Sequence, residues 1–261
     1  MRSQSPVAAI HRRDRIVITS CIVLITVLAW AYLVHLDRQM VSSSGAGTTM
    51  ANMAMTANVS WSGRDVFFVF TMWSVMMVGM MSAPAAPVLL LFARTGPARA
   101  KGGRLAILLF GLGYLSIWLG FSTFAALAQW ALHDAGLLSP SMSASGPRIA
   151  GAILIAAGLY QLTPAKNACL TQCQSPLGFL MSNWRDGAKG ALEMGARHGL
   201  YCLGCCWAIM CVLFAVGVMN LAWVAVLTAF ILLEKTGRKG ALVARVGGLI
   251  IIAFGVVIVA S

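Results

Sequence analysis

Long apolar runs separated by short polar segments dominate the pattern along the chain. The predominantly apolar runs are 16–36, 64–92, 105–131, 148–163, 190–218, 221–233 and 241–260. Most approach the ~20 residues that a helix needs to cross ~30 Å of hydrocarbon, and two are shorter. Backbone polar groups in lipid must pair internally, so these runs are expected to be helices. The pattern predicts an all-α fold, a polytopic transmembrane helical bundle of about seven spans.

The polar segments divide the chain into regions. Residues 1–15 form a basic tail that we expect to be cytoplasmic, and residues 16–36 form the first transmembrane span. Residues 37–63 are expected to be an outside loop rich in Met and Ser, containing the run MANMAM. Residues 64–261 are expected to form a six-span membrane domain that carries the candidate metal ligands described below. Within it, residues 164–189 are interpreted as a loop, because proline at position 164 blocks further helix.

Composition and charge agree with a membrane location. Only 10% of the residues are charged, whereas a soluble domain has about a quarter. If the N-terminus is cytoplasmic, all but three of the 19 Lys and Arg residues lie on the inner side, the exceptions being Arg38, Arg64 and Arg148. This bias predicts an N-in, multi-pass protein of the cell inner (cytoplasmic) membrane. The net charge of +12 is therefore a topology signal that indicates lipid, not nucleic acid, as the partner.

The run 190–218 carries the most distinctive chemistry. At ~100° per residue, Met194, His198, Cys202 and Cys205 fall on one stripe of a helix, and Cys206 borders it. Thiols and imidazole favour Cu(I) and Zn over Mg or Ca. An ionisable group inside a span indicates a functional site, because burying it unpaired is costly. The alternative is that the cysteines pack as small hydrophobic residues and that His198 hydrogen-bonds a carbonyl.

Methionines crowd the run 64–92. Met72, Met76 and Met80 share one helical face, and Met77 and Met81 share the next. Thioethers suit Cu(I), although methionine also fills irregular gaps between helices. If these residues carry metal, the first face should lie against the Cys and His stripe, making a ladder of soft ligands across the membrane.

Two further cysteines lie in the expected loop 164–189. Cys169 and Cys173 are spaced to share a helical face if this loop is helical, but Pro164 and Pro176 bracket them. The chain has seven cysteines, an odd number, and none lies in an expected outside segment. This distribution indicates reduced thiols rather than a disulfide framework.

Several long motifs carry a resemblance to a known family. They read YQLTPAKNACLTQCQSPLGFL, WRDG, GARHGLYCLGCCW and MNLAWVAVL with a later LLEK, and the second run contains MMVGMM. Here the chain resembles a bacterial family of unknown function described as predicted metal-binding integral membrane proteins, some labelled copper chaperone. The resemblance covers the chain from about residue 64 onward. It implies metal-ligand positions at Cys169, Cys173, His198, Cys202, Cys205 and Cys206.

Three functions remain open from the sequence. The first is an integral membrane protein that binds Cu(I), with zinc as the alternative metal, and passes it to an accepting protein or across the membrane. The second is a membrane thiol oxidoreductase, because Cys202 and Cys205 form a C-x-x-C motif. The third is a structural or assembly subunit, and a homo-oligomer is compatible with each. We expect no enzyme of the hydrolytic kind, because Glu193 is the only carboxylate close to the His198 stripe.

Overall fold

The computed structural model describes residues 12–45, 61–94, 103–138, 146–218, 220–237 and 239–260. The predicted methionine-rich segment MANMAM lies outside the described residues. The helices are α1 (Arg12–Gly45), α3 (Gly63–Phe92), α5 (Gly103–Asp134), α6 (Pro147–Gln161), α7 (Pro164–Gln174), α8 (Pro176–Ser182), α9 (Gly187–Val216), α10 (Leu221–Thr236) and α11 (Gly240–Ala260).

Each apolar run of the sequence forms a helix, which confirms the all-α helical bundle. The main difference lies in residues 164–189, where the expected loop contains α7 and α8. Proline blocks a helix interior but is well suited to the first turn, where its missing N–H would have no partner. Pro164 therefore begins α7, and the Thr163 side chain caps it by accepting a hydrogen bond from the backbone N–H of Lys166. Helix α1 also continues past the predicted end of its span, to Gly45.

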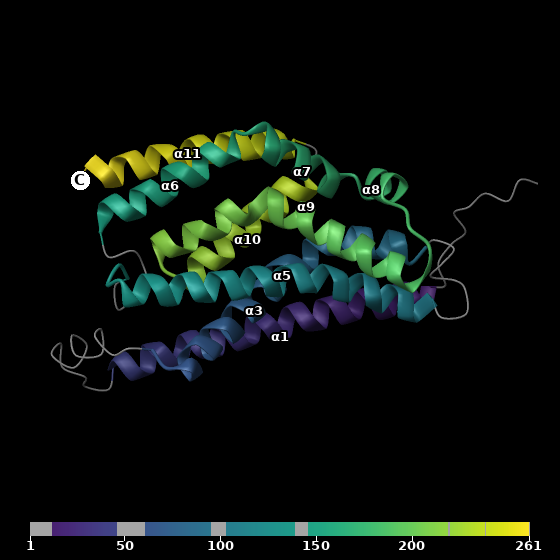
Figure 1. Cartoon of the computed structure of the whole chain (residues 1–261), viewed down its shortest axis with the longest axis horizontal. Coiled ribbons are helices and arrows are strands. Elements are labelled where there is room, and N and C mark those ends of the chain that lie inside the picture. The colour runs from purple at the N-terminus through teal and green to yellow at the C-terminus, as the bar shows by residue number, and fades with distance from the viewer. Residues whose placement is uncertain are drawn as a thin grey trace, which may run out of the picture.

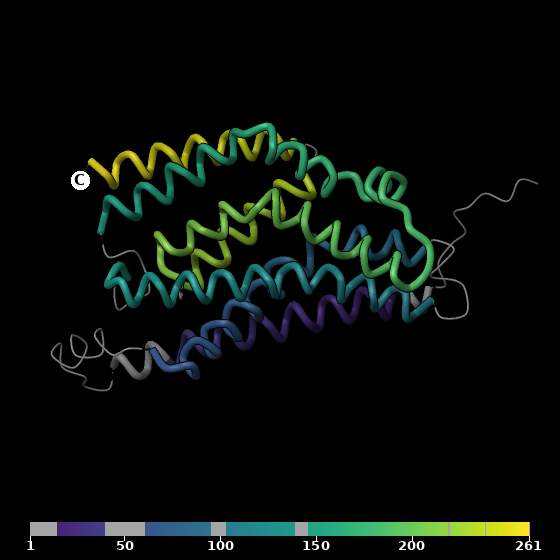
Figure 2. Tube along the Cα trace, viewed as in Figure 1, coloured from purple at the N-terminus to yellow at the C-terminus, as the bar shows by residue number. Residues whose placement is uncertain are grey.

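The long helices run side by side along the longest axis of the molecule (Figure 1). Helix α9 lies in the middle of the bundle, where it contacts α5 on one side and α6 and α7 on the other. Helix α11 packs along α6, and α1 packs along α3. The trace in Figure 2 shows the short helices α7 and α8 at the bend between α6 and α9. This arrangement brings the cysteine-bearing helices α7 and α9 together.

Glycines permit the close approach of α9 to α5. A Cβ atom at Gly195 would overlap the backbone carbonyl of Phe110, and one at Gly199 would lie 3.0 Å from the Ile117 side chain. Both glycines are on the α9 face that the G-x3-G spacing defines. The two helices therefore touch through backbone atoms, which leaves little freedom for α9 to rotate about its axis.

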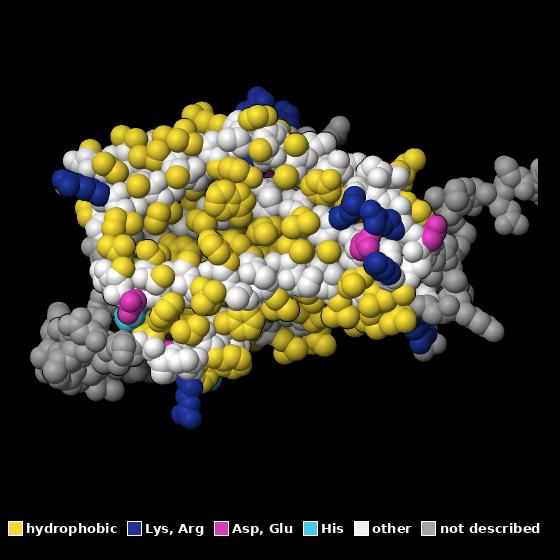
Figure 3. Space-filling view, viewed as in Figure 1, with side chains coloured by type: hydrophobic (Ala, Val, Ile, Leu, Met, Phe, Trp, Pro, Cys, Tyr) yellow, Lys and Arg dark blue, Asp and Glu magenta, His cyan; other side chains and the backbone are white. Residues whose placement is uncertain are grey.

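Five described helices are long and apolar enough to cross a membrane: α3, α5, α9, α11 and the α1 segment Arg15–Gln39. Helices α6 and α7 pass the same test together, but they meet at a bend of 63°. Between the two ends of the face in Figure 3, the surface is largely apolar, and Lys and Arg lie toward the ends and at the edge near α7 and the start of α11. Such an apolar surface fits a lipid environment, and the number of spans and the N-in orientation stay predictions.

The topology is open to a direct test with reporter fusions. A reporter after Ser261 should read as outside and one inserted near Gly102 as inside, because the basic residues are so unevenly divided. Activity-based reporters that fold on one side of the membrane only would measure this. An inside reading at the C-terminus would mean that α10, or the α6–α7 pair, does not cross.

Candidate metal centre

The thiols of α7 and α9 meet inside the bundle. The sulfur atoms of Cys173 and Cys205 are 4.0 Å apart. Cys202, Cys205 and Cys206 are buried on α9, and a Cβ atom at Gly204 would lie only 2.8 Å from the Cys169 sulfur. The spacing along α7 explains why its two thiols are close to α9. Cys169 and Cys173 are one helical turn apart, so they share a face, and α7 packs against α9.

A buried lysine contacts these sulfurs from α10. The Nζ atom of Lys235 lies 2.9 Å from the Cys202 sulfur, 3.9 Å from the Cys206 sulfur and 3.8 Å from the Met81 sulfur. Only 7% of Lys235 is exposed. Removing an ammonium group from water is costly unless acceptors or a negative charge compensate it. Here the acceptors are sulfur atoms from α3 and α9.

A tyrosine on α5 also contacts the Cys202 sulfur. The Tyr114 hydroxyl lies 3.1 Å from the Cys202 sulfur and donates a hydrogen bond of 2.9 Å to the backbone carbonyl of Met81. Tyr114 is buried. Cys202 thus has neighbours on α5 and α10, which hold its position from two sides.

A buried ion pair links α7 to α10. The carboxylate of Glu234 accepts hydrogen bonds of 2.7 Å and 2.9 Å from Lys166, and both residues are fully buried. Gln161 donates to the same carboxylate and accepts from Lys166. Gln174, at the end of α7, donates to the backbone carbonyl of Glu234. Consecutive residues of α10 therefore tie both cysteine-bearing helices, Glu234 to α7 and Lys235 to α9.

His198 lies one turn before Cys202 on α9 and is 2% exposed. Its ring is 5.0 Å from the Phe179 ring and 5.7 Å from the Tyr114 ring, measured between centroids. Its Nδ1 atom is buried and has no hydrogen-bond partner among the described residues. A buried polar atom without a partner is uncommon and calls for an explanation such as a ligand.

The methionines of α3 are all buried, but their neighbours differ from the expectation. Met72 and Met76 line a small pocket together with residues of α1 and α10, including Asp37. Met81, from the adjoining face, is the methionine whose sulfur contacts Lys235. Met77 and Met80 are also buried, in the same hydrophobic core as Cys202.

The structure does not assemble every predicted ligand into one group. Among the described residues, no three His, Cys, Asp or Glu side chains lie so that they could hold a metal ion together. The joint role of His198, Cys202 and Cys205 therefore stays a prediction. The pair that the structure brings together, Cys173 and Cys205, combines α7 with α9.

A family model described as "Copper chaperone" matches residues 70–258. The chain belongs to this family. The copper-chaperone match begins within α3, ends within α11 and leaves out α1. The family description supports copper binding in general. Comparisons with curated proteins and with solved structures give no match.

Sequence reasoning missed the polar partners of the thiols. Lys166 and Lys235 were counted as inner-surface charges, and neither Glu234 nor Tyr114 was singled out. The available signal was position: Glu234 and Lys235 directly follow an apolar run too short to carry them clear of the membrane. Adjacent opposite charges there indicate partners inside the bundle.

Breaking the Lys166–Glu234 pair should destabilise the protein strongly. Lys166→Met leaves a buried carboxylate uncompensated, which should cost about 3–5 kcal/mol of unfolding free energy. The double variant Lys166→Met/Glu234→Leu should recover most of that loss, because both charges are gone. Thermal unfolding in detergent would measure both variants.

The matched control is the exposed ion pair between Arg185 and Glu193. Arg185→Met should cost less than about 1 kcal/mol, because water screens an exposed pair. If Lys166→Met is no more harmful than Arg185→Met, the buried pair does not hold α7 against α10.

Proposed function

We propose that the protein is an integral membrane protein that binds Cu(I) as cargo through sulfur ligands and delivers it to an accepting protein or across the membrane. The copper-chaperone family supports copper as the metal. The observation that carries the proposal is the pair of thiols from α7 and α9, Cys173 and Cys205, whose sulfurs face each other at 4.0 Å.

This separation suits one metal ion bound between the two sulfurs. Metal–thiolate bonds of about 2.3 Å place two sulfurs about 4.0 Å apart at a bond angle of ~120°, and about 4.6 Å apart when the bonds are opposite. A disulfide would instead need about 2.05 Å. Thiolates are ligands that favour Cu(I), and structural zinc takes four ligands.

Charge also favours a monovalent cargo. Two thiolates and one Cu(I) together carry one net negative charge, and the ammonium of Lys235, which contacts the neighbouring Cys202 and Cys206 sulfurs, supplies one positive charge. The loaded site is then neutral as a whole, which lowers the cost of holding it away from water. The remaining sulfurs, Cys169, Cys202 and Cys206, offer places to which the ion can exchange.

The position of the C-x-x-C motif favours copper over thiol oxidoreduction. Reactive cysteines of such oxidoreductases lie at helix N-termini, where the helix dipole activates the thiolate. Cys202 and Cys205 lie in the middle of α9. A soft-metal cargo would also give the buried methionines of α3 a role beyond packing.

The setting of this function follows from the topology. With the N-terminus inside, α7, α8 and the start of α9 lie toward the cytoplasmic side of the inner membrane, as the basic residues predict. Cys169 and Cys173 are half-buried whereas the α9 thiols Cys202, Cys205 and Cys206 are buried, so the α7 thiols are the more open to a cytoplasmic acceptor. We infer that copper is handed over there.

Cu(I) titration of the purified full chain, under reducing conditions and in competition with a chromogenic Cu(I) chelator, tests the proposal. Cys173→Ser and Cys205→Ser should each weaken binding at least tenfold, because each removes one of two facing sulfurs. His198→Asn should weaken it as well if the unpaired Nδ1 atom is a ligand.

Two cysteines provide matched controls. Cys21 is exposed on α1 and Cys211 lies further along α9, away from the thiol pair, so serine at either position should leave Cu(I) binding unchanged. A wild-type chain that fails to bind Cu(I), or an equal loss from Cys211→Ser, would count against the site. Tighter binding of Zn(II) than of Cu(I) would reassign the metal.

A further inference from the structure

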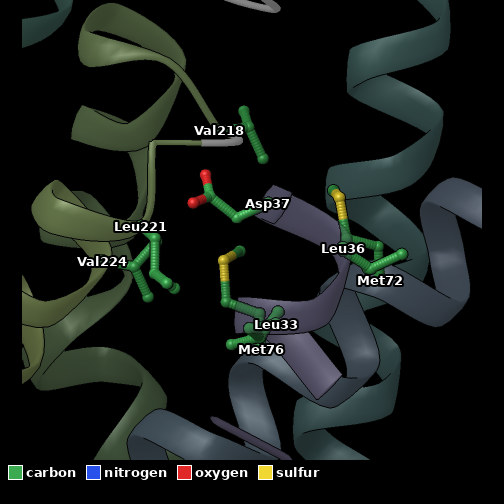
Figure 4. A pocket seen from close by; sticks show the side chains of 8 residues that line it. All are labelled: Leu33, Leu36, Asp37, Met72, Met76, Val218, Leu221 and Val224. Carbon is green, nitrogen blue, oxygen red and sulfur yellow. The ribbon is translucent and has the colours of Figure 1, made fainter. Parts of the chain in front are cut away.

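A small pocket lies between α1, α3 and the start of α10, apart from the thiols. Figure 4 shows Asp37 of α1 and Met76 of α3 directed into it, with Met72 also extending from α3. The other lining side chains are aliphatic, for example Leu33 and Val224. Its volume of about 20 Å³ is enough for a water molecule or a single ion.

The polar and sulfur atoms of the pocket make an unusual set. Met72 and Met76 are one helical turn apart, so both thioethers lie on the same face of α3. Asp37 is half-buried, and within the described part of the chain no hydrogen bond or ion pair reaches its carboxylate. No group among the described residues neutralises this half-buried carboxylate, so a cation in the pocket would be its charge partner.

We propose that this pocket is a second site for a soft monovalent cation, with the sulfurs of Met72 and Met76 as ligands and Asp37 as the neutralising charge. Its assignment to Cu(I) rests on the function proposed above. Thioethers are neutral and soft, so they bind Cu(I) without losing protons. One carboxylate balances one monovalent ion, whereas a divalent ion would keep a net charge in an apolar setting.

The location of the pocket gives this site a place in the path of the metal. From Met76, α3 continues through Met77 and Met80 to Met81, all of them buried. The Met81 sulfur is 3.8 Å from Lys235, which contacts the Cys202 sulfur at 2.9 Å. The pocket therefore stands at one end of the methionine-bearing part of α3, and Met81 at the other end lies beside Lys235 and the thiols. In the N-in topology the pocket end faces outside.

The pocket also assigns a role to α1. The copper-chaperone match begins at residue 70, so Asp37 comes from a helix outside it. Helix α1 packs along α3, and the methyl group of Ala29 would lie 3.2 Å from a Cβ atom at Gly79. This close contact holds α1 in the position from which Asp37 reaches the pocket.

The test titrates Ag(I), a redox-stable soft monovalent ion, into the full chain in detergent and determines the number of bound equivalents by mass spectrometry of the metal. The wild-type chain should bind two classes of Ag(I). Asp37→Asn and Met72→Leu/Met76→Leu should each remove one class or weaken it at least tenfold, while Cys173→Ser removes the other. Asp134→Asn and Met210→Leu serve as controls for charge and for a buried methionine, and neither should change the count.

A second measurement needs no variant. Bound Ag(I) should protect Met72 and Met76 of the wild-type chain from peroxide oxidation, read by peptide mass spectrometry, and Zn(II) should not. Unchanged stoichiometry in the Asp37 and Met variants together with unprotected methionines overturns the second site. If only Cys173→Ser then loses Ag(I), the proposed function stands without the second site. If only the pocket variants lose Ag(I), the second site stands and the thiol site is overturned. A wild-type chain that binds no Ag(I) overturns both.

Discussion

The burial of two adjacent opposite charges on α10 is the constraint on which the candidate centre depends. Glu234 is fully buried and Lys235 nearly so, and neither charge could remain there without compensation. Because consecutive helical residues point about 100° apart, the two side chains reach different neighbours. Glu234 is paired with Lys166 on α7, and Lys235 is surrounded by sulfur atoms of α3 and α9. The solvation requirement of α10 thus brings the cysteine-bearing helices together.

Close helix packing turns this electrostatic link into a defined geometry. Gly195 and Gly199 hold α9 against α5 through backbone contacts, and Tyr114 on α5 then reaches the Cys202 sulfur. A helix held this closely cannot turn its cysteines toward lipid without separating from α5. The positions of the thiols therefore follow from glycine contacts on one side of α9 and from charges on the other.

The fold was largely predictable from the sequence, because an apolar run in lipid has few alternatives to a helix. The segment 164–189 was the exception. Proline in an apolar run predicts the end of a helix, but here Pro164 and Pro176 each begin one, capped by Thr163 and Ser175. Whether a proline ends one helix or begins the next depends on the residues that follow it and on their packing.

The site was predictable only in part, since periodicity identifies residues that share a face but not the neighbour of that face. The sequence predicts two methionine faces on α3, but it does not say what each face contacts. The packing of α3 against α1 and α5 sets the rotation at which Met81 contacts Lys235 while Met76 lines the same pocket as Asp37. In the same way, the partners of Lys166 and Lys235 depend on contacts between distant segments, which one sequence does not reveal.

The two proposed sites balance the charge of the bound ion with different groups, and this difference affects how the ion would move. In the pocket, neutral thioethers and one carboxylate balance a monovalent cation. At the thiols, two anionic sulfurs and one cation need the ammonium of Lys235 to reach the same balance. Between them the α3 thioethers carry no charge, so an ion there is unbalanced and should not rest long. Metal would then reside at the two ends of the row, and the attraction of the anionic thiols would favour transfer from the pocket toward Cys173 and Cys205.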